Sequence, residues 1–244
     1  MDRELPSHLA IRPLNLGDLA QVTELEALCF SKEQAASETS IKYRLSVCPE
    51  LTSGMFIRTF GGKYSNEGAK SSSVEAQPHH KKFMGFSSNN TADNSEYIPD
   101  ETSSIVSERL IGHLLSTKIR KEFIQEADME VPEWFVKNDG TSPVRNGNDD
   151  KVGHVESSDI IGLHSVAVHS EFRGKKIGSL MLHDYLQKLS NQQVGSIISI
   201  MAKPGLVKYY ESVGFVDKGI SDYNYGGAEW HDMHIELKPE EAKM

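Results

Sequence analysis

The stretch LHSVAVHSEFRGKKIGSLMLHDYLQKLS, residues 163–190, contains the signals that decide the fold. Branched apolar residues between positions 160 and 168 predict a β-strand. Apolar residues then recur at three- and four-residue spacing over 177–189, which predicts an amphipathic helix. The basic, glycine-containing turn RGKKIG, residues 173–178, joins the two. Such a turn aims the unpaired N–H groups of a helix N-terminus at one point, so the stretch predicts a site for an anion such as a pyrophosphate.

The composition favours one α/β core. The chain has 244 residues, 38% of them apolar and 25% charged, so we expect a single domain over 1–244. Its 26 Lys and Arg against 35 Asp and Glu give a net charge of −9, which disfavours nucleic-acid binding and suits a cationic small substrate. No apolar run reaches the length of a membrane span, and the two cysteines have no metal-ligand spacing. We therefore expect a monomeric, cytoplasmic protein that binds neither metal nor membrane.

The remaining elements follow from caps and periodicity. Asn15 is placed to cap a helix that ends near Phe30, and Ser37 caps a second, short helix that Pro49 stops. The first of these helices has an expected apolar side of Leu19, Val22, Leu25, Leu28 and Cys29. Strands are predicted at 9–14, 55–60, 110–119, 196–202, from 215 onward and at 230–237, with a helix at 206–213 ended by Gly214.

Two polar segments interrupt this pattern. Residues 61–104 contain few large apolar side chains, so they cannot bury enough surface to offset the entropy of ordering, and we expect a disordered insertion. The apolar patch at 83–86 within it would extend a hairpin, bind a partner or be a chance cluster. Residues 138–158 are rich in turn-forming residues, which predicts a long loop.

The anion site matches neither nucleotide motif that such a turn first suggests. Residues 173–178 lack the G-x-G-x-x-G of dinucleotide folds and the Gly-Lys-Ser/Thr of phosphate-binding loops. They do resemble motif A of the Gcn5-related N-acetyltransferases (GNAT), through Arg173, Ile177 and Gly178. Lys176 stands where that motif has its first glycine. The segment LVKYYESVGF, residues 206–215, resembles motif B of the same family.

A closer resemblance is to the arylalkylamine N-acetyltransferases, through LHSVAVH at 163–169, CPELTSGMF at 48–56 and the motif B segment. LHDYLQKLSNQ at 182–192 resembles the fungal polyamine acetyltransferases. Together the resemblance covers about residues 8–60, 108–120 and 158–237.

The resemblance implies a GNAT fold, an α/β class with a mixed, mostly antiparallel sheet that is flanked by helices and splayed at its central strands. It also implies acetyl-coenzyme A as cosubstrate. The residues expected to contact the coenzyme are Val166, Ala167, Val168, Arg173, Gly174, Lys175, Lys176, Ile177, Gly178 and Ser179. Backbone N–H groups should supply most of this binding, because a basic trio at a helix start is otherwise typical of a solvated turn.

His164 is the candidate general base. Two-residue alternation places it on the same strand face as Val166 and Val168, beside the backbone expected to hold the acetyl group. From the residues alone, a half-buried histidine bonded to a backbone carbonyl is the more typical interpretation. The family resemblance favours the catalytic role, but Gly162 stands where the animal enzymes have a second histidine. His113 or a water chain would have to replace it.

Tyr210 is the candidate general acid, since it matches the family tyrosine placed near the coenzyme sulfur. Without the resemblance, Tyr209 and Tyr210 would both be read as core-facing. The resemblance also places Phe30 and Met201 in the acceptor pocket, although both are equally typical of an ordinary core. The loop at 31–37 lacks the proline that follows the aromatic residue in the animal enzymes.

These features predict direct acetyl transfer to a small primary amine in a ternary complex. No acyl-enzyme is expected, because neither Cys29 nor Cys48 lies in a recognised nucleophile setting. The acceptor would be an arylalkylamine, a polyamine or a protein amino terminus. A non-catalytic GNAT-fold module that binds coenzyme or partners is the alternative from another class.

Overall fold

The structure is a computed structural model that describes residues 5–61, 105–137 and 151–238. The chain divides into two compact units, one made of 1–58 and 108–244 and the other of 59–107. The first unit contains every predicted site residue. The expected insertion, with its patch at 83–86, lies almost wholly outside the described residues, as do 138–150 of the predicted loop. Residues 151–158, at the end of that loop, form turns and bends without a helix or strand.

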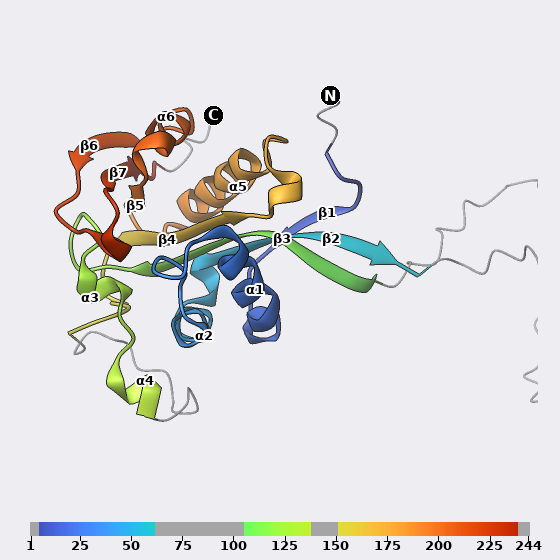
Figure 1. Cartoon of the computed structure of the whole chain (residues 1–244), viewed down its shortest axis with the longest axis horizontal. Coiled ribbons are helices and arrows are strands. Elements are labelled where there is room, and N and C mark those ends of the chain that lie inside the picture. Colours follow the sequence, from blue (N-terminus) through green and yellow to red (C-terminus); the bar gives the residue numbers. More distant parts are fainter. Residues whose placement is uncertain (1–4, 62–104, 138–150, 239–244) are drawn as a thin grey trace, which may run out of the picture. The chain divides into compact units, whose positions relative to one another are not determined.

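The elements follow the predicted order (Figure 1). The strands are β1 (Leu9–Arg12), β2 (Thr52–Phe60), β3 (Ile105–Lys118), β4 (Ile160–Val168), β5 (Ile197–Ala202), β6 (Val216–Ile220) and β7 (His231–Glu236). The helices are α1 (Leu19–Cys29), α2 (Glu38–Val47), α3 (Glu126–Met129), α4 (Glu133–Lys137), α5 (Ile177–Gln192) and α6 (Val207–Glu211), with short 3-10 turns between several of them. The two short helices α3 and α4 were not anticipated from the sequence.

The strands form one seven-stranded sheet in the order β1-β2-β3-β4-β5-β7-β6. The central pair β4 and β5 is parallel, whereas β3 with β4 and β5 with β7 are antiparallel. Pairing between β4 and β5 covers only Ile160–Leu163 against Ile197–Ile200. Both strands continue past this point, so they part after Leu163. The mixed, mostly antiparallel sheet and its predicted splay near Val166–Val168 are thus confirmed.

Helices cover both faces of the sheet (Figure 1). On one face α5 packs its apolar side, including Met181, Leu182 and Leu189, against Ile161 and Leu163 of β4. On the other face α1 and α2 pack against the central strands in a second cluster. Burying each such Leu or Ile side chain contributes roughly 1.5–3 kcal/mol, so the amphipathic pattern that predicted α5 is also what fixes it to the sheet.

The predicted cap of α2 at Ser37 is confirmed, whereas Asn15 caps the 3-10 turn Leu16–Asp18 that leads into α1, and Asp18, the N-cap of α1 itself, makes no side-chain cap hydrogen bond. Asn15 Oδ1 accepts a hydrogen bond from the Gly17 N–H at 2.8 Å, and Ser37 Oγ accepts one from the Ser40 N–H at 3.1 Å. The predicted apolar side of α1 is wrong at Leu28, whose side chain is 63% exposed. The buried residues of α1 are Val22, Leu25 and Glu26, at the i, i+3, i+4 spacing of a single helix face. The Glu26 carboxylate can be buried on that face because neighbouring polar groups hydrogen-bond to it, as described below.

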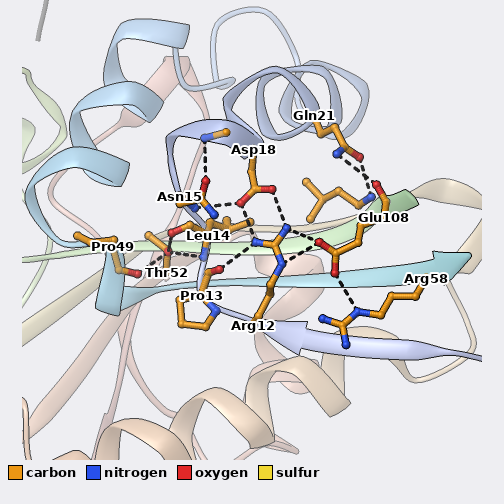
Figure 2. A network of polar contacts seen from close by, with 12 residues as sticks. Arg12, Pro13, Leu14, Asn15, Asp18, Gln21, Pro49, Thr52, Arg58 and Glu108 are labelled. Atoms are coloured by element: carbon orange, nitrogen blue, oxygen red, sulfur yellow. Dashed lines mark hydrogen bonds and ion pairs between the residues drawn. The ribbon is translucent and has the colours of Figure 1, made fainter. Parts of the chain in front are cut away.

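A polar network joins the start of the chain to the sheet (Figure 2). The Arg12 guanidinium lies between two carboxylates, donating to Asp18 and to Glu108 at 2.8 Å each. Arg58 donates to the other Glu108 oxygen at 2.9 Å, and the Arg12 guanidinium also lies 3.9 Å from the Phe56 ring centroid. Because Asp18 precedes α1 directly, this network fixes where that helix begins relative to β1 and β3.

Candidate active site

A cavity of about 640 Å³ lies where β4 and β5 part. This volume is in the range of small-molecule sites, roughly 300–1,000 Å³. Its lining comes from both faces of the sheet: Ile177 to Ser179 of α5 on one side, and Glu26 of α1 with Phe30 directly after that helix on the other. A second, more open hollow of about 760 Å³ between α5, β6 and β7 contains none of the predicted site residues. The cavity at the splay is therefore the candidate active site.

A β-bulge in β4 changes which way His164 faces. Leu115 of β3 pairs with Ser165, and the next residue, Ser116, pairs with Leu163, so His164 is the extra residue. Residues that pair across two strands have their side chains on the same face of the sheet. Ser116 accepts a hydrogen bond from the Tyr185 hydroxyl of α5, so Ser116 and its partner Leu163 lie on the face that α5 covers.

Val166 and Val168 also pack with the α5 cluster, whereas Ser165 bonds Glu26 of α1. His164 hydrogen-bonds Thr117, whose cross-strand partner Gly162 lies opposite the α5 face. The prediction that His164 shares a face with Val166 and Val168 is thus wrong, because two-residue alternation fails across a bulge. All three still line the cavity, which is open to both faces at the splay.

The His164 imidazole is held by a single side chain among the residues described. Its Nε2 lies 2.7 Å from Thr117 Oγ1, and its Nδ1 is buried without a hydrogen-bond partner. Burial, with the nearby positive charge of Arg44 and then His154, holds the pKa of His164 well below its usual value of 6.5. The imidazole is therefore neutral at pH 7, as a proton acceptor must be.

A buried polar cluster, which the sequence analysis missed, lies beside this histidine. Glu26 Oε2 accepts hydrogen bonds from Ser165 Oγ at 2.7 Å and contacts His113 Nε2 at 2.8 Å, while Glu26 Oε1 accepts one from the Ala36 N–H at 3.0 Å. Burial alone would raise the pKa of Glu26, but these bonds outweigh burial and hold it below its ordinary 4.5. Glu26 is thus a charged carboxylate in the cavity wall.

His113, considered above as a substitute for the missing family histidine, is fully buried and lies behind Glu26. It does not line the cavity. Glu26 could have been noticed in the sequence as a charged residue on the face shared by Val22 and Leu25, but that pattern does not say what compensates it.

The turn before α5 has the geometry that an anion site needs. Gly174 has φ +74 and Lys176, the N-cap of α5, has φ +61. These two left-handed residues bend the chain tightly enough to begin a helix directly after the turn. The first N–H groups of any helix have no partner within it, and here they belong to residues 177–179, which line the cavity. Lys176, which stands where the family motif has its first glycine, thus adopts the left-handed conformation that glycine takes most easily.

The basic side chains of the turn mostly contact the protein itself. Arg173 Nε donates to the Val168 carbonyl at 3.0 Å and so ties the turn to the end of β4. Lys175 Nζ lies 5.6 Å from the Phe172 ring centroid, and Lys175 is the predicted coenzyme residue that does not line the cavity. The residues present fit a pyrophosphate through backbone N–H groups, with Lys176 as an additional positive charge at the cavity.

Tyr209 and Tyr210 both line the cavity, but their settings differ. Tyr209 hydrogen-bonds Ser179 of α5, and its hydroxyl lies 2.7 Å from where a Cβ on Gly178 would stand. Tyr210 is 5% exposed and packs edge-on against Phe215 at 5.8 Å. Burial raises the pKa of the Tyr210 phenol well above its ordinary value of 10, so Tyr210 keeps its proton over the physiological range.

The acceptor side of the cavity is largely aromatic and thioether in character. Phe30 and Met201, both predicted there, line it as expected. They are joined by three residues that the sequence analysis did not single out, Met129, Tyr225 and Trp230. These come from α3 and from the segment between β6 and β7, so only the tertiary structure places them beside α1.

Within the described ranges, no group of three or more His, Cys, Asp or Glu side chains is placed to hold a metal ion. The helices among the same residues are too short or too polar to cross a bilayer.

The comparisons with known proteins agree with this geometry. Residues 104–237 match the family model of the acetyltransferase (GNAT) domain. This match covers more than half of the chain, which therefore belongs to the GNAT acetyltransferase family. Among similar proteins, serotonin N-acetyltransferase of Macaca mulatta is 31% identical over 85 residues, which are 35% of this chain and 42% of that protein. The uncharacterized N-acetyltransferase ycf52 of Pyropia yezoensis is 26% identical over 76 residues, or 30% of this chain and 43% of that one. The chain thus spans about two fifths of the length of these relatives.

Solved structures share the fold at low sequence identity. The loading GNATL domain of CurA from Lyngbya majuscula has a TM-score of 0.56 at 12% identity, covering 95% of this chain and 98% of that one. The GphF GNAT-like decarboxylase in complex with isobutyryl-CoA has a TM-score of 0.55 at 12% identity, covering 94% and 100%. Both likenesses concern the fold alone.

Proposed function

We propose that this protein transfers an acetyl group from acetyl-coenzyme A directly to a small primary amine. The observation that carries the proposal is that the cavity at the splay reaches the N-terminus of α5 at one end and Glu26 and Phe30 at the other. One end suits a pyrophosphate and the other a cationic, apolar amine, and His164 and Tyr210 both line the space between.

The α5 end would hold the coenzyme. Backbone N–H groups of the first helical turn and the positive end of the helix dipole favour phosphate oxygens. At Val166 to Val168, β4 is paired with β3 but no longer with β5, so the edge of β4 that faces β5 can offer backbone groups to the pantetheine portion. Membership of the GNAT family and the complex of a similar fold with isobutyryl-CoA support this assignment.

His164 would accept the proton of the attacking amine. An amine attacks only as the neutral species, so a neutral imidazole beside the acceptor is the group the reaction needs. In this role the ring donates from Nε2 to Thr117 and receives the proton, directly or through a water, at Nδ1, the atom with no partner among the described residues. The charge of Glu26 would favour binding of the protonated amine before it is deprotonated.

Tyr210 would donate a proton to the departing thiolate. Its raised pKa keeps the phenol protonated, so the proton is available when the carbon–sulfur bond breaks. Tyr209 is already engaged with Ser179, which leaves Tyr210 as the acid.

The lining favours an arylalkylamine over a polyamine. Phe30, Tyr225 and Trp230 offer aromatic surfaces to an aromatic acceptor. A polyamine carries several positive charges, but Glu26 is the one carboxylate among the lining residues in the described part of the chain.

The test is thiol release from acetyl-coenzyme A with tryptamine, phenethylamine, spermidine and a short peptide as acceptors. We expect turnover of the aromatic amines, and its loss in Tyr210→Phe and His164→Gln variants that keep the wild-type circular dichroism spectrum. Coenzyme binding by calorimetry without thiol release from any acceptor would overturn the proposal in favour of a binding module.

A further inference from the structure

Gln34, in the loop after α1, has a side-chain oxygen in the cavity wall that the protein itself does not use. The residue lines the cavity at the splay. Its Oε1 atom is buried and has no hydrogen-bond partner among the residues that the structure describes. Buried side-chain oxygens nearly always have a partner, so an unpaired one beside a binding cavity indicates that a ligand supplies the N–H or O–H group.

The loop that carries Gln34 is fixed by its own backbone. The Ser31 carbonyl accepts hydrogen bonds from the N–H of Gln34 at 3.0 Å and from that of Ala35 at 2.8 Å. The next N–H along the chain, that of Ala36, donates to Glu26 Oε1 at 3.0 Å. The Gln34 side chain therefore starts from a defined position, as selective recognition of a ligand requires.

The turn between β6 and β7 packs against the Gln34 side chain. Gly226 in this turn has φ +60, and a Cβ there would lie 2.7 Å from Gln34 Cγ and 2.9 Å from the Glu33 carbonyl oxygen. Only a glycine allows this approach. The turn begins at Tyr225, which lines the cavity and whose carbonyl accepts a hydrogen bond from the Trp230 indole N–H at 2.8 Å. Gln34 thus lies against the aromatic wall of the acceptor side.

The reacting amine belongs at a different part of the acceptor side. Glu26 accepts a hydrogen bond from Ser165, the neighbour of His164 on β4, so the carboxylate that suits an ammonium lies beside the proposed base. Gln34 packs instead against the segment before β7, where the lining is aromatic. An acceptor whose amine lies at His164 would therefore extend its ring toward Gln34.

We infer that Gln34 selects acceptors whose aromatic ring carries an N–H or O–H group, through a hydrogen bond from that group to Oε1. The inference rests on the proposed function and adds a specificity-determining residue to it. A ring with such a donor satisfies the unpaired oxygen, whereas a ring of the same shape without one leaves it buried and unpaired.

The test compares acceptors that match in shape and differ in the ring donor. Tyramine is paired with para-methylphenethylamine, and tryptamine is paired with its benzofuran analogue, in which an oxygen replaces the indole N–H. Thiol release from acetyl-coenzyme A gives kcat/KM for wild type, Gln34→Met and Gln34→Glu. Gln187→Met is the control, because Gln187 is an exposed glutamine of α5 that lines the other hollow.

In wild type we expect the acceptor with the ring donor to have the higher kcat/KM in at least one pair, by roughly 10-fold. Gln34→Met keeps the unbranched stem and should abolish the preference, by lowering kcat/KM for the donor-bearing acceptor and changing the donor-free one little. Gln34→Glu, which has only oxygen acceptors at the end of its side chain, should retain the preference. Gln187→Met should behave as wild type.

A second readout does not depend on turnover. Calorimetry with coenzyme A present measures binding of the acetylated products of the same pairs. Tighter binding of the donor-bearing product that disappears in Gln34→Met, with the wild-type circular dichroism spectrum kept, supports the inference.

Three outcomes would count against the inference. No preference in either pair, or a preference that survives in Gln34→Met, overturns it. A preference lost in Gln34→Glu as well would assign the contact to the Gln34 Nε2 atom and overturn the role of Oε1. Amines acetylated without any donor preference would refute the inference alone, whereas thiol release from no acceptor would refute the proposed function.

Discussion

The Nε2 atom of His164 lies 2.7 Å from the hydroxyl of Thr117, and the described residues offer no partner to its Nδ1. This contact fixes the orientation of the ring at the bulge in β4. It also separates the two ring nitrogens into one that is held and one that is free to take a proton. If the ring acts as the base, its Thr117 contact sets the tautomer that does so.

Thr117→Val should therefore impair the reaction without removing the base. We expect kcat to fall about 10-fold, against about 10²–10⁴-fold for His164→Gln. Thr117→Ser, which keeps the hydroxyl, should recover most of the rate. Single-turnover thiol release at saturating coenzyme measures the effect, and equal rates for Thr117→Val and wild type would remove Thr117 from the mechanism.

The lowered pKa of His164 also predicts how stability depends on pH. Because the folded-state pKa lies below the unfolded value of 6.5, the unfolded chain binds a proton first as the pH falls. Stability is then full above about pH 6.5 and declines below it, down to the folded pKa. Urea unfolding between pH 7.5 and 5 should show this decline in wild type and a shallower one in His164→Gln. An unchanged slope in the variant would show that His164 is not responsible.

Tyr210→Phe should lower kcat with little change in coenzyme affinity, since the phenol is assigned to the leaving thiolate. General acid catalysis typically contributes about 10²–10⁴-fold, and we expect a loss in that range. Tyr209→Phe is the matched control, because the neighbouring ring lines the same cavity but hydrogen-bonds Ser179. Steady-state kinetics for both variants decide the assignment, and a larger loss in Tyr209→Phe would reverse it.

Gly178 and Tyr209 should be coupled. A Cβ at Gly178 would lie 2.7 Å from the Tyr209 hydroxyl, so Gly178→Ala must displace that ring or the start of α5. We expect Gly178→Ala to weaken coenzyme A binding, measured by calorimetry, and Tyr209→Phe to restore part of it in the double variant. Additive losses in the double-mutant cycle would show that the two sites act independently.

Glu26→Gln should raise KM for cationic acceptors, because it removes the carboxylate from the acceptor side while keeping nearly the same shape. The effect should shrink for acceptors of lower amine pKa, which bind as the neutral species. Glu24→Gln is the matched control, because it is the same substitution at an exposed glutamate two residues earlier on α1. Kinetics with a series of ring- and chain-substituted amines test this, and an equal KM effect across the series would argue for a purely structural role.

The Arg12 network predicts an acid-sensitive contribution to stability (Figure 2). Burial alone would raise the pKa of Asp18, but the Arg12 hydrogen bonds outweigh it, and Arg12 also lowers the pKa of Glu108. Stability from this network is present above the unfolded values of 3.8 and 4.5 and is lost as the pH falls through the lower folded values. Arg12→Met should cost about 1–3 kcal/mol at pH 7 and much less near pH 3. Urea unfolding at both pH values checks this, and a cost that does not shrink with acid would assign it to lost packing on Phe56.

The sequence by itself determined the class of fold, the order of most elements and the place of the anion site. These follow from short-range rules: caps at Asn15 and Ser37, the 3.6-residue period of 177–189, and the turn at 173–178 with its motif resemblance. Such rules act within a few residues, so they can be read without knowing what the segment packs against.

What only the tertiary structure decided depends on contacts between distant segments. The bulge that turns His164 away from Val166 arises from the register of β4 against β3, which local alternation cannot reveal. The partners of Glu26 come from β3, β4 and the loop after α1. A buried charge is stabilised or left uncompensated by whatever the whole fold brings to it, because its interactions reach through space and not along the chain.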